Sequence, residues 1–396
     1  MDHYNQSIGC WCGTTALEPF SEHYLFCPSC KSLRLNASVG DVAHVSDGET
    51  DLYGKYYYLR HLPEKYGYPD IETRARHDLP ERCLYWLRTL LKYKPPPSKI
   101  LELGCAHGGF VSLLQWAGYE ATGLELSPWL ANYASGIFGV TVLAGPIEDQ
   151  QIAPASLDVI VLMDVLEHLQ NPVATVSHCL GLLKPDGIFL IQTPSFPENK
   201  SYEQLQNESS PFLEQLKYDE HLHLFSKSSI TEFFSRIGFD SVRFEPAIFS
   251  HYDMFFLSGR TAVTVHPQEE IVTALTVSPS GRLMQALIDI DDEKRNWIRK
   301  YAEAEADRAA RLAVIHKLEQ QLAEAEADRT AKLAAIHKLE RQHLTAQKRF
   351  RQISQELHGI VAERDKELEI VKTSFSWRIT SLLRWVLGKI SSTEKP

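Results

Sequence analysis

The sequence lacks several features that mark common classes of protein. It contains no run of 18 apolar residues in its 396 positions, which argues against a membrane-spanning helix. The first residues form neither a basic nor an apolar leader segment, so we expect a cytoplasmic protein. Positive charge is also scarce, with 41 Lys and Arg against 51 Asp and Glu, for a net charge of -10. Because nucleic-acid surfaces need clustered cations, we expect no nucleic-acid partner.

Two phosphate-binding motifs are missing from the glycine-containing loop in residues 99–110, which read KILELGCAHGGF. A dinucleotide loop needs Gly-x-Gly-x-x-Gly, but Ala106 occupies the position of the second glycine. A Walker loop needs Gly-Lys-Ser/Thr, which this loop does not contain. Glu102 would repel a pyrophosphate, but it can neutralise the ammonium group of a ligand such as S-adenosylmethionine. Further along, Glu125 ends an apolar run and can accept both hydroxyls of a ribose.

Short apolar runs alternate with helical patterns between residues 99 and 260, which predicts an α/β fold with a doubly wound, largely parallel sheet. We expect one helix to open at Asn171, a good N-cap, with Pro172 in its first position. The last two apolar runs have no helix between them and predict an antiparallel pair at one edge. The seven expected strands cover residues 99–104, 119–126, 140–145, 157–163, 187–194, 241–246 and 253–259.

Five stretches of this region resemble, in order, the motifs of class I S-adenosylmethionine-dependent methyltransferases. They read LELGCAHGG, GLELSP, GPIEDQ, LMDVLEHL and LLKPDGIFLIQTP. The resemblance implies a seven-stranded Rossmann-like sheet over residues 99–262 and an enzyme that transfers a methyl group from S-adenosylmethionine. It also implies which residues contact that cofactor: Glu102, Gly104, Ala106, Gly108, Glu125, Leu126, Ile147, Glu148 and Asp164.

The stretch DEHLHLFS, after the fifth expected strand, resembles the Glu-His-x-x-Tyr-Phe-Ser stretch of bacterial sugar C-methyltransferases. The resemblance implies that His221 is the base that takes the acceptor's proton and that Glu220 is its partner. Leu224 stands where that family tends to have Tyr. In LYGKYYYLRH, Tyr56 is the candidate acceptor-site tyrosine, with Tyr57 as the other candidate. The alternative is a surface loop whose histidines help to close the next helix, with the tyrosines packed as core.

Four of the seven cysteines lie near the N-terminus as a Cys-x-Cys pair and a Cys-x-x-Cys pair, formed by Cys10, Cys12, Cys27 and Cys30. Two close pairs of thiolates suit tetrahedral Zn²⁺, so we expect a structural zinc site; another metal and plain thiols are the alternatives. A shell of four cysteines leaves no open position for catalysis at the metal. The module is similar to the four-cysteine zinc module at the start of the sugar C-methyltransferases, which usually has two Cys-x-x-Cys pairs.

The sequence after residue 280 is rich in Ala, Glu, Arg, Leu and Lys, and it contains a repeat. Residues 302–322 recur as residues 323–343, a displacement of 21 residues that equals three heptads. This period predicts a coiled coil over residues 284–372 that forms a dimer or trimer. Arg308 and Arg329 interrupt the apolar seam, so a lone solvated helix is the alternative.

The tail over residues 373–396 combines Trp377 and Trp385 with apolar and basic residues at helical spacing. This pattern is typical of a helix that lies on an anionic membrane surface. We therefore expect residues 374–390 to contact the inner membrane face; docking on the protein itself is the alternative. The stretch SWRIT resembles C-terminal tails of glycosyltransferases that assemble bacterial polysaccharides.

Together these observations predict six segments and one activity, methyl transfer to a saccharide in bacterial polysaccharide biosynthesis. The long helix replaces the second α/β domain of sugar C-methyltransferases, so a hydroxyl acceptor is at least as well supported as carbon. The rival hypothesis is a catalytically idle methyltransferase-like scaffold for polysaccharide-assembly enzymes. The segments are a zinc module (1–45), an aromatic-rich helical cap (46–98), the methyltransferase domain (99–262), a linker (263–283), the coiled coil (284–372) and the tail (373–396).

Overall fold

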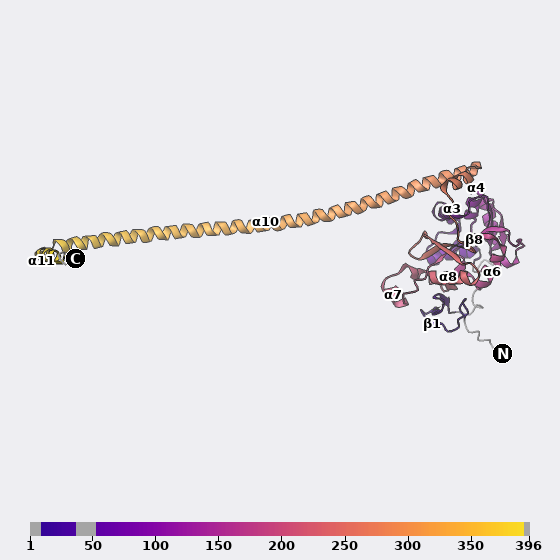
Figure 1. Cartoon of the computed structure of the whole chain (residues 1–396), viewed down its shortest axis with the longest axis horizontal. Coiled ribbons are helices and arrows are strands. Elements are labelled where there is room, and N and C mark those ends of the chain that lie inside the picture. Colours follow the sequence, from indigo (N-terminus) through magenta and orange to yellow (C-terminus); the bar gives the residue numbers. More distant parts are fainter. Residues whose placement is uncertain (1–8, 37–52, 392–396) are drawn as a thin grey trace. The chain divides into compact units, whose positions relative to one another are not determined.

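The computed structural model describes residues 9–36 and 53–391, apart from some side chains near the end of the last helix (Figure 1). Parts of the expected zinc module, of the aromatic cap and of the tail therefore lie outside the described residues. The chain divides at Trp297 into two compact units.

A seven-stranded mixed sheet forms the centre of the first unit. Its strands are β4 (Lys99–Leu103), β5 (Glu120–Glu125), β6 (Val142–Ala144), β7 (Leu157–Met163), β8 (Leu183–Pro194), β10 (Ser241–Glu245) and β11 (Asp253–Gly259). They lie in the order β10-β11-β8-β7-β4-β5-β6, and the strands from β8 to β6 pair in parallel. β11 pairs antiparallel with both β8 and β10. The predicted fold class, with its antiparallel pair at one edge, is confirmed.

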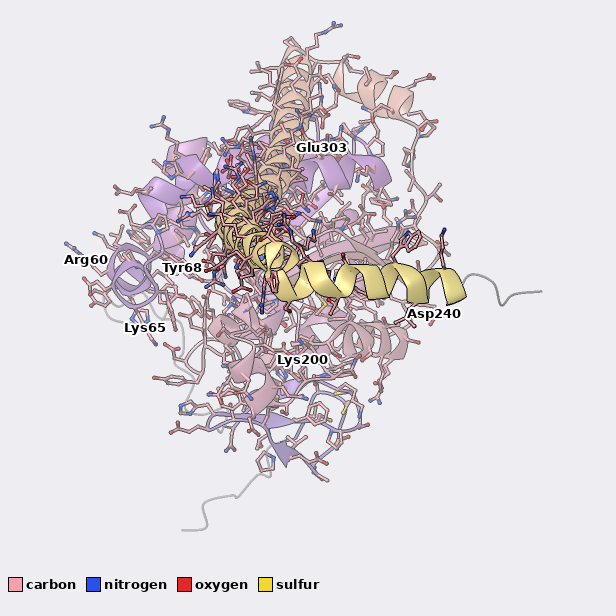
Figure 2. All side chains as sticks on the ribbon, turned by 90° about the vertical axis from the view of Figure 1, so that its left-hand side faces the viewer. Arg60, Lys65, Tyr68, Lys200, Asp240 and Glu303 are labelled. Carbon is pink, nitrogen blue, oxygen red and sulfur yellow. The ribbon has the colours of Figure 1, made fainter. Side chains whose placement is uncertain are left out.

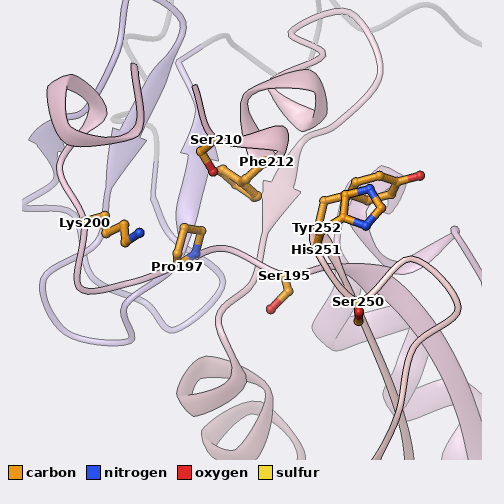
Figure 3. Close-up of a pocket in the computed structure, with 8 residues that line it drawn as sticks. All are labelled: Ser195, Pro197, Lys200, Ser210, Phe212, Ser250, His251 and Tyr252. Atoms are coloured by element: carbon orange, nitrogen blue, oxygen red, sulfur yellow. The ribbon is translucent and has the colours of Figure 1, made fainter. Parts of the chain in front are cut away.

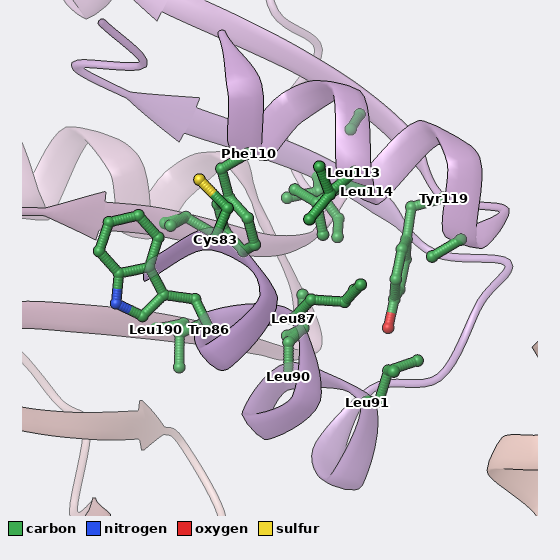
Figure 4. Packing of buried hydrophobic residues seen from close by; sticks show 14 of the residues in the cluster. Cys83, Trp86, Leu87, Leu90, Leu91, Phe110, Leu113, Leu114, Tyr119 and Leu190 are labelled. Atoms are coloured by element: carbon green, nitrogen blue, oxygen red, sulfur yellow. The ribbon is translucent and has the colours of Figure 1, made fainter. Parts of the chain in front are cut away.

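Helices cover both faces of this sheet, which explains why its strands are apolar on both sides. Val161 of β7 packs into one hydrophobic cluster, and the next residue, Leu162, packs into the other. In the first cluster, shown in Figure 4, Trp86 lies edge-on against Phe110 with ring centroids 5.5 Å apart. The first face is covered by α3 (Leu84–Tyr93), α4 (Gly109–Ala117) and α9 (Gln268–Leu275), and the second by α6 (Pro172–Leu182) and α8 (Lys227–Arg236).

Side-chain caps begin the helices that follow the predicted motifs. Asn171 Oδ1 accepts a hydrogen bond from Ala174 N at 3.1 Å, and Pro172 opens α6 as predicted. Ser127 caps α5 (Pro128–Phe138) in the same way, directly after the GLELSP strand. Shorter helices complete the domain: α1 (Leu62–Tyr66), α2 (Ile71–Asp78) and α7 (Tyr202–Asn207).

A second, four-stranded sheet joins the N-terminal module to the central domain. It contains β1 (Glu18–Pro19), β2 (Tyr24–Phe26), β3 (Leu33–Leu35) and β9 (His223–Leu224). The last of these belongs to the DEHLHLFS stretch, and β3 pairs antiparallel with it. The sequence analysis did not predict this sheet. Each strand is only two or three residues long, which is too short to show an alternation of apolar and polar residues.

The expected linker over residues 263–283 is partly helical and contributes to the core. It contains α9 and the start of α10 (Pro279–Thr373). Met284 is fully buried in the cluster on the α3 face, and Arg88 of α3 donates to Asp291 of α10 at 2.7 Å. The first turns of α10 therefore pack on the domain, and its core extends beyond residue 262, where the sequence analysis placed the end of the domain.

Within the second unit, α10 continues as part of a single helix of 95 residues, and α11 (Phe375–Ser391) follows it. The helix is confirmed, whereas its pairing in a coiled coil remains a prediction. The apolar side chains of the predicted seam are 48% to 74% exposed: Ile315, Leu318, Leu322, Ile336, Leu339, Phe350, Ile353, Leu357 and Ile360.

Among the described residues, no helix is long and apolar enough to cross a membrane. Most apolar side chains of α11 lie outside the described ones, so membrane contact of residues 374–390 stays a prediction.

We predict that Met284→Ala lowers the free energy of unfolding by about 2–5 kcal/mol, because it leaves a cavity where α10 meets the core. Leu287→Ala on the same helix is the matched control, since Leu287 is 40% exposed, and should cost less than about 1 kcal/mol. Urea unfolding of the full chain, followed by tryptophan fluorescence, measures both. Equal effects would show that the start of α10 does not belong to the core.

Candidate functional site

The loop between β4 and α4 has the backbone that the glycine pattern predicts. Gly104, Ala106 and Gly108 have φ values of 67°, 46° and 77°, in the left-handed region that favours glycine. A Cβ at Gly104 would lie 2.6 Å from Val165 Cγ2. The loop thus exposes main chain to a ligand at the carboxyl end of β4, where open α/β sheets bind their ligands.

Two buried carboxylates lie at this loop. Glu125 accepts hydrogen bonds from Ala106 N at 3.1 Å and from Ser127 N at 3.2 Å. Burial raises the pKa of Glu125, although these backbone N–H groups lower it. Glu102 Oε2 has no hydrogen-bond partner among the described residues, and burial, followed by the charge of Glu125, raises the pKa of Glu102 well above its usual range. A buried carboxylate with a free oxygen fits a cationic ligand group, such as the ammonium of S-adenosylmethionine.

The remaining predicted cofactor residues lie after the neighbouring strands. Ile147 is buried in a short turn after β6, Glu148 accepts from Thr175 at 2.8 Å, and Leu126 is exposed. Asp164 follows β7 with a φ of 57° and accepts from Gln192 Nε2 at 3.1 Å. The fold therefore gathers all nine predicted residues at the ends of β4, β5, β6 and β7.

The imidazole of His221 is held in one tautomer. Its Nδ1 lies 2.8 Å from the carbonyl oxygen of Gln215; a carbonyl only accepts, so Nδ1 carries the proton and Nε2 keeps a lone pair. Burial, followed by the nearby His168, lowers the pKa of His221 well below its usual range. The ring is therefore a neutral hydrogen-bond acceptor at physiological pH.

The expected pairing of Glu220 with His221 is not found, because Gln215 orients the imidazole. The Glu220 side chain lies instead beside His61 and Asp219, with one ligand atom of each within 4.8 Å of the others. Glu220 is only 4% exposed, and its Oε1 has no hydrogen-bond partner in the part of the chain that the structure describes. Burial raises the pKa of Glu220, while a hydrogen bond from Tyr57 lowers it. Glu220 is thus available to a ligand rather than engaged in positioning a base.

Tyr57, and not Tyr56, belongs to this site. Tyr56 is 46% exposed, whereas Tyr57 is 6% exposed and stacks on His61 with ring centroids 5.5 Å apart. The three consecutive tyrosines lie in one helical stretch, so only some of them face inward. Tyr53, which the sequence analysis missed, has its hydroxyl 2.9 Å from His168 Nδ1 and lies within electrostatic reach of both Glu125 and Glu220. The aromatic segment therefore connects the two halves of the site.

A patch of aromatic and charged side chains continues from Glu220. Tyr66 donates to Asp219 at 2.8 Å, and Lys65 forms a salt bridge with the same carboxylate. Lys217 Nζ lies 4.9 Å from the centre of the Tyr68 ring. Lys65 and Tyr68 are labelled in Figure 2. The patch offers ring faces together with donors and acceptors.

Three carboxylates gather between the two halves of the site. Burial, followed by the charge of Asp164, raises the pKa of Glu167 to about 8 and that of Asp253 to about 9. Thr193 donates to Glu167 Oε2 at 2.9 Å, and Arg82 Nη1 lies 3.6 Å from Asp164 Oδ2. Three carboxylates beside one arginine therefore favour a bound proton or cation in this part of the site.

The four predicted cysteines converge. One sulfur pair, Cys10 and Cys30, is separated by 3.4 Å, and the other, Cys12 and Cys27, by 3.6 Å. All four sulfurs lie within 4.8 Å of one another, and tetrahedral Zn²⁺ with its usual bond lengths needs about 3.8 Å between sulfurs. The residues therefore fit a structural metal ion with a closed shell.

The cysteine module contacts the acceptor loop directly. Tyr24, which is fully buried, donates from its hydroxyl to the carbonyl oxygen of His221 at 2.9 Å. Arg34 donates to the carbonyl oxygen of Leu222 at 3.0 Å, and Leu35 N donates to the same oxygen at 3.0 Å. Together with the β3·β9 pairing, these bonds fix the backbone that carries Glu220 and His221.

A polar cavity of about 260 Å³ lies beyond the carboxyl end of β8 (Figure 3). Lys200 and three serines contribute to its lining, and no predicted site residue does. The lining residues are Ser195, Pro197, Lys200, Ser210, Phe212, Ser250, His251 and Tyr252.

Residues 75–243 match the family model described as "Methyltransferase domain". A ubiquinone biosynthesis O-methyltransferase of Burkholderia vietnamiensis is 30% identical over 142 residues, which cover 33% of this chain and 59% of the relative. A probable S-adenosylmethionine-dependent methyltransferase of Mycolicibacterium smegmatis is 29% identical over 118 residues, covering 28% and 46%. The chain thus spans about half the length of these curated relatives.

Solved structures of methyltransferases are also similar to part of this chain. A possible histamine N-methyltransferase from Thermotoga maritima has 18% identity and a TM-score of 0.37, covering 51% of this chain and 99% of its own. A putative methyltransferase from Bacillus halodurans has 18% identity and a TM-score of 0.34, covering 41% and 69%. Residues 75–243 therefore match a methyltransferase family model, and the strand order of the central sheet is that of a Rossmann-like methyltransferase fold.

We predict that removing the metal from the cysteine module with a chelator speeds hydrogen exchange in residues 220–224. The module then no longer holds β3 against β9, and the loop loses the bonds from Tyr24 and Arg34. Exchange in β4 should stay unchanged, because that strand pairs only within the central sheet. Mass-spectrometric exchange on the full chain measures both; equal protection of residues 220–224 with and without metal would contradict the bracing role.

Proposed function

We propose that the chain is an S-adenosylmethionine-dependent methyltransferase whose acceptor is a saccharide hydroxyl. One observation carries the proposal: the same domain holds a free buried carboxylate, Glu102, at a glycine loop and a neutral imidazole, His221, that keeps a lone pair. The cofactor supplies a methyl group on a sulfonium, which makes the carbon electrophilic. The chain then has to hold the two reactants in line and take a proton from the hydroxyl.

On the cofactor side, each residue has one task. Glu102 neutralises the ammonium group, and the backbone of the glycine loop receives the amino-acid part of the ligand. Glu125 exchanges its bonds with Ala106 and Ser127 for the two ribose hydroxyls, which are equivalent donors. Ile147 supplies a buried apolar surface for the adenine.

On the acceptor side, the side chains suit a saccharide. Ring faces such as those of Tyr57 and Tyr68 can cover the apolar face of a sugar ring, while Glu220 and His61 accept or donate bonds to hydroxyls. His221 Nε2 takes the proton of the reacting hydroxyl, because the bond from Nδ1 to Gln215 keeps that lone pair free.

A phenolic hydroxyl is the second candidate acceptor, because several relatives are named ubiquinone biosynthesis O-methyltransferases. Their names support oxygen over carbon as the methyl acceptor. The polar surroundings of Glu220 and the likeness of the cysteine module to sugar-modifying enzymes favour the saccharide. The idle scaffold for polysaccharide assembly is the remaining alternative, and the free buried carboxylates argue against it, because they destabilise a fold that binds nothing.

We predict that the full chain transfers label from methyl-labelled S-adenosylmethionine to a glycan extract and that the product is a base-stable ether. Glu125→Ala should abolish cofactor binding in calorimetry and turnover in the same preparation. Glu120→Ala is the matched control, because Glu120 is exposed at the other end of the same strand, and it should change neither.

The outcomes separate the candidates. Label that enters a catechol but no saccharide would favour the phenolic acceptor. Folded protein that binds no cofactor would refute the enzyme and leave the scaffold.

We also propose that the chain self-associates through α10. The half-exposed seam repeats every seven residues, and its second copy of 21 residues extends the same stripe, so two or three parallel helices can bury it along its length. The arginines in the seam lower its stability, because charged side chains fit an apolar seam poorly, and polar seam positions of this kind favour one register.

We predict that the full chain sediments as a dimer or trimer of its 45.0 kDa protomer. Leu339→Lys with Ile353→Lys, two seam positions, should shift it to monomer. Leu344→Lys is the control, because Leu344 is 54% exposed yet lies outside the seam. A monomeric wild-type chain, or equal effects of seam and control substitutions, would contradict the coiled coil.

A further inference from the structure

A second group of metal-ligating side chains lies in the cleft, apart from the cysteines. One ligand atom from each of Glu167, His168 and His221 lies within 4.8 Å of the other two. His168 Nε2 is 4.0 Å from Glu167 Oε1, and the two imidazole rings are centred 4.9 Å apart. The three come from two segments, the stretch after β7 and the acceptor loop, so the fold assembles them.

Both imidazoles are oriented as in metal sites. His221 Nδ1 bonds to the carbonyl of Gln215 at 2.8 Å, and His168 Nδ1 lies 2.9 Å from the carbonyl of Glu220. A carbonyl partner requires the proton on Nδ1 of His221, so that ring keeps its lone pair on Nε2. Nδ1 of His168 lies 2.9 Å from the Tyr53 hydroxyl as well as from the Glu220 carbonyl. Both oxygens can accept from one Nδ1–H, which leaves the lone pair of His168 on Nε2. Metal-binding histidines usually show this arrangement, with the other nitrogen bonded to a backbone carbonyl or a carboxylate.

The carboxylate of Glu167 is likewise held by a hydrogen bond to one of its two oxygens. Glu167 is 1% exposed, and Thr193 holds its Oε2 at 2.9 Å. For Glu167 Oε1, as for Nε2 of His168 and of His221, no hydrogen bond is found within the described part of the chain. The three side chains therefore keep acceptor capacity for an ion bound between them.

The charge around the three ligands also suits a cation. Asp164 and Asp253 lie within electrostatic reach of Glu167. Two cations face these acids. Arg82 Nη1 lies 3.6 Å from Asp164 Oδ2, and the Lys217 ammonium donates to the Tyr68 hydroxyl at 3.2 Å. Three carboxylates against two cations leave room for a divalent ion, which would relieve the remaining repulsion.

We propose that Glu167, His168 and His221 bind one divalent transition-metal ion that receives the acceptor hydroxyl. Two imidazoles and one carboxylate on one side of the ion suit metals such as Mn²⁺, Fe²⁺, Co²⁺ or Zn²⁺ and leave positions open for oxygen ligands. Bond lengths near 2.1 Å require ligand atoms about 3.0–3.4 Å apart, so the side chains must close on the ion by roughly 1 Å.

This inference rests on the proposed methyl transfer and refines its acceptor side. A hydroxyl bound to the ion loses its proton to solvent more readily, because the metal stabilises the alkoxide. The alkoxide oxygen forms the new bond to the methyl carbon while the sulfonium's bond to that carbon breaks, leaving a neutral thioether. With the ion bound, His221 Nε2 is a ligand, so the ion replaces His221 in the role of activating the hydroxyl, and the proton goes to solvent.

The test uses the full chain with its cysteine module loaded with zinc, into which Mn²⁺ is titrated. Mn²⁺ is a poor partner for thiolates, so its electron paramagnetic resonance signal reports the second site alone. We expect one bound Mn²⁺ per chain, at least tenfold weaker binding in Glu167→Gln and His221→Asn, and unchanged binding in His223→Asn. His223 is the matched control, because it is buried in the same loop but lies outside the three ligands.

Binding of S-adenosylmethionine, measured on every variant, shows that each one is folded and keeps the cofactor half. Zinc-loaded protein that binds the cofactor but no Mn²⁺ overturns the metal site, as does a methyl transfer rate that does not change in protein stripped of Mn²⁺. Protein that binds Mn²⁺ at these residues but no cofactor would instead refute the proposed function and leave the metal site standing.

Discussion

The pairing of β3 with β9 is the contact on which the acceptor side of this protein depends. It joins a module near the N-terminus to a loop almost two hundred residues away, and Tyr24 and Arg34 add side-chain bonds to the carbonyls of that loop. The loop carries Glu220 and His221, neither of which has a regular element of its own to fix it. β3 and β9 are too short to be stable alone. A hydrophobic cluster that joins Tyr24 and Leu33 to Leu224 supports them, and a metal ion bound by the cysteines would hold the module rigid.

The two halves of the site differ in how they are held. The cofactor half is built on the ends of parallel strands and on capped helices, so its geometry follows from the central core. The acceptor half is built from loops and short strands that are braced from outside that core. Loss of the metal should therefore affect the two halves unequally. An acceptor site placed on such a module can change its specificity without disturbing the cofactor loop.

Sequence patterns predicted the cofactor half well and the acceptor half only in part. Glu102, Glu125 and the loop between them follow from one strand, one turn and one helix, which are local features. The contacts of Glu220 and His221 were not predicted, because Gln215 lies near His221, and His61 near Glu220, only in the fold. Tyr56 was preferred to Tyr57 because a run of three tyrosines has no periodicity that shows which side chain faces the interior. The sequence did not reveal that the start of α10 packs in the core. The residues around Met284 show the same helical pattern as the predicted coiled coil, so they were assigned to it.

The free carboxylates give the clearest physical sign of function. Buried acids without partners lower stability by about 1–3 kcal/mol each, and a domain that served only as a scaffold would gain by replacing them. Glu102 and Glu220 each keep an oxygen without a hydrogen-bond partner within the described residues, and Glu167 lies between Thr193 and His168. A cationic ligand group near Glu102 and a hydroxyl near Glu220 would satisfy the two free oxygens. These two acids therefore support the proposed enzyme over the scaffold, because a domain that binds nothing gains no stability from keeping them.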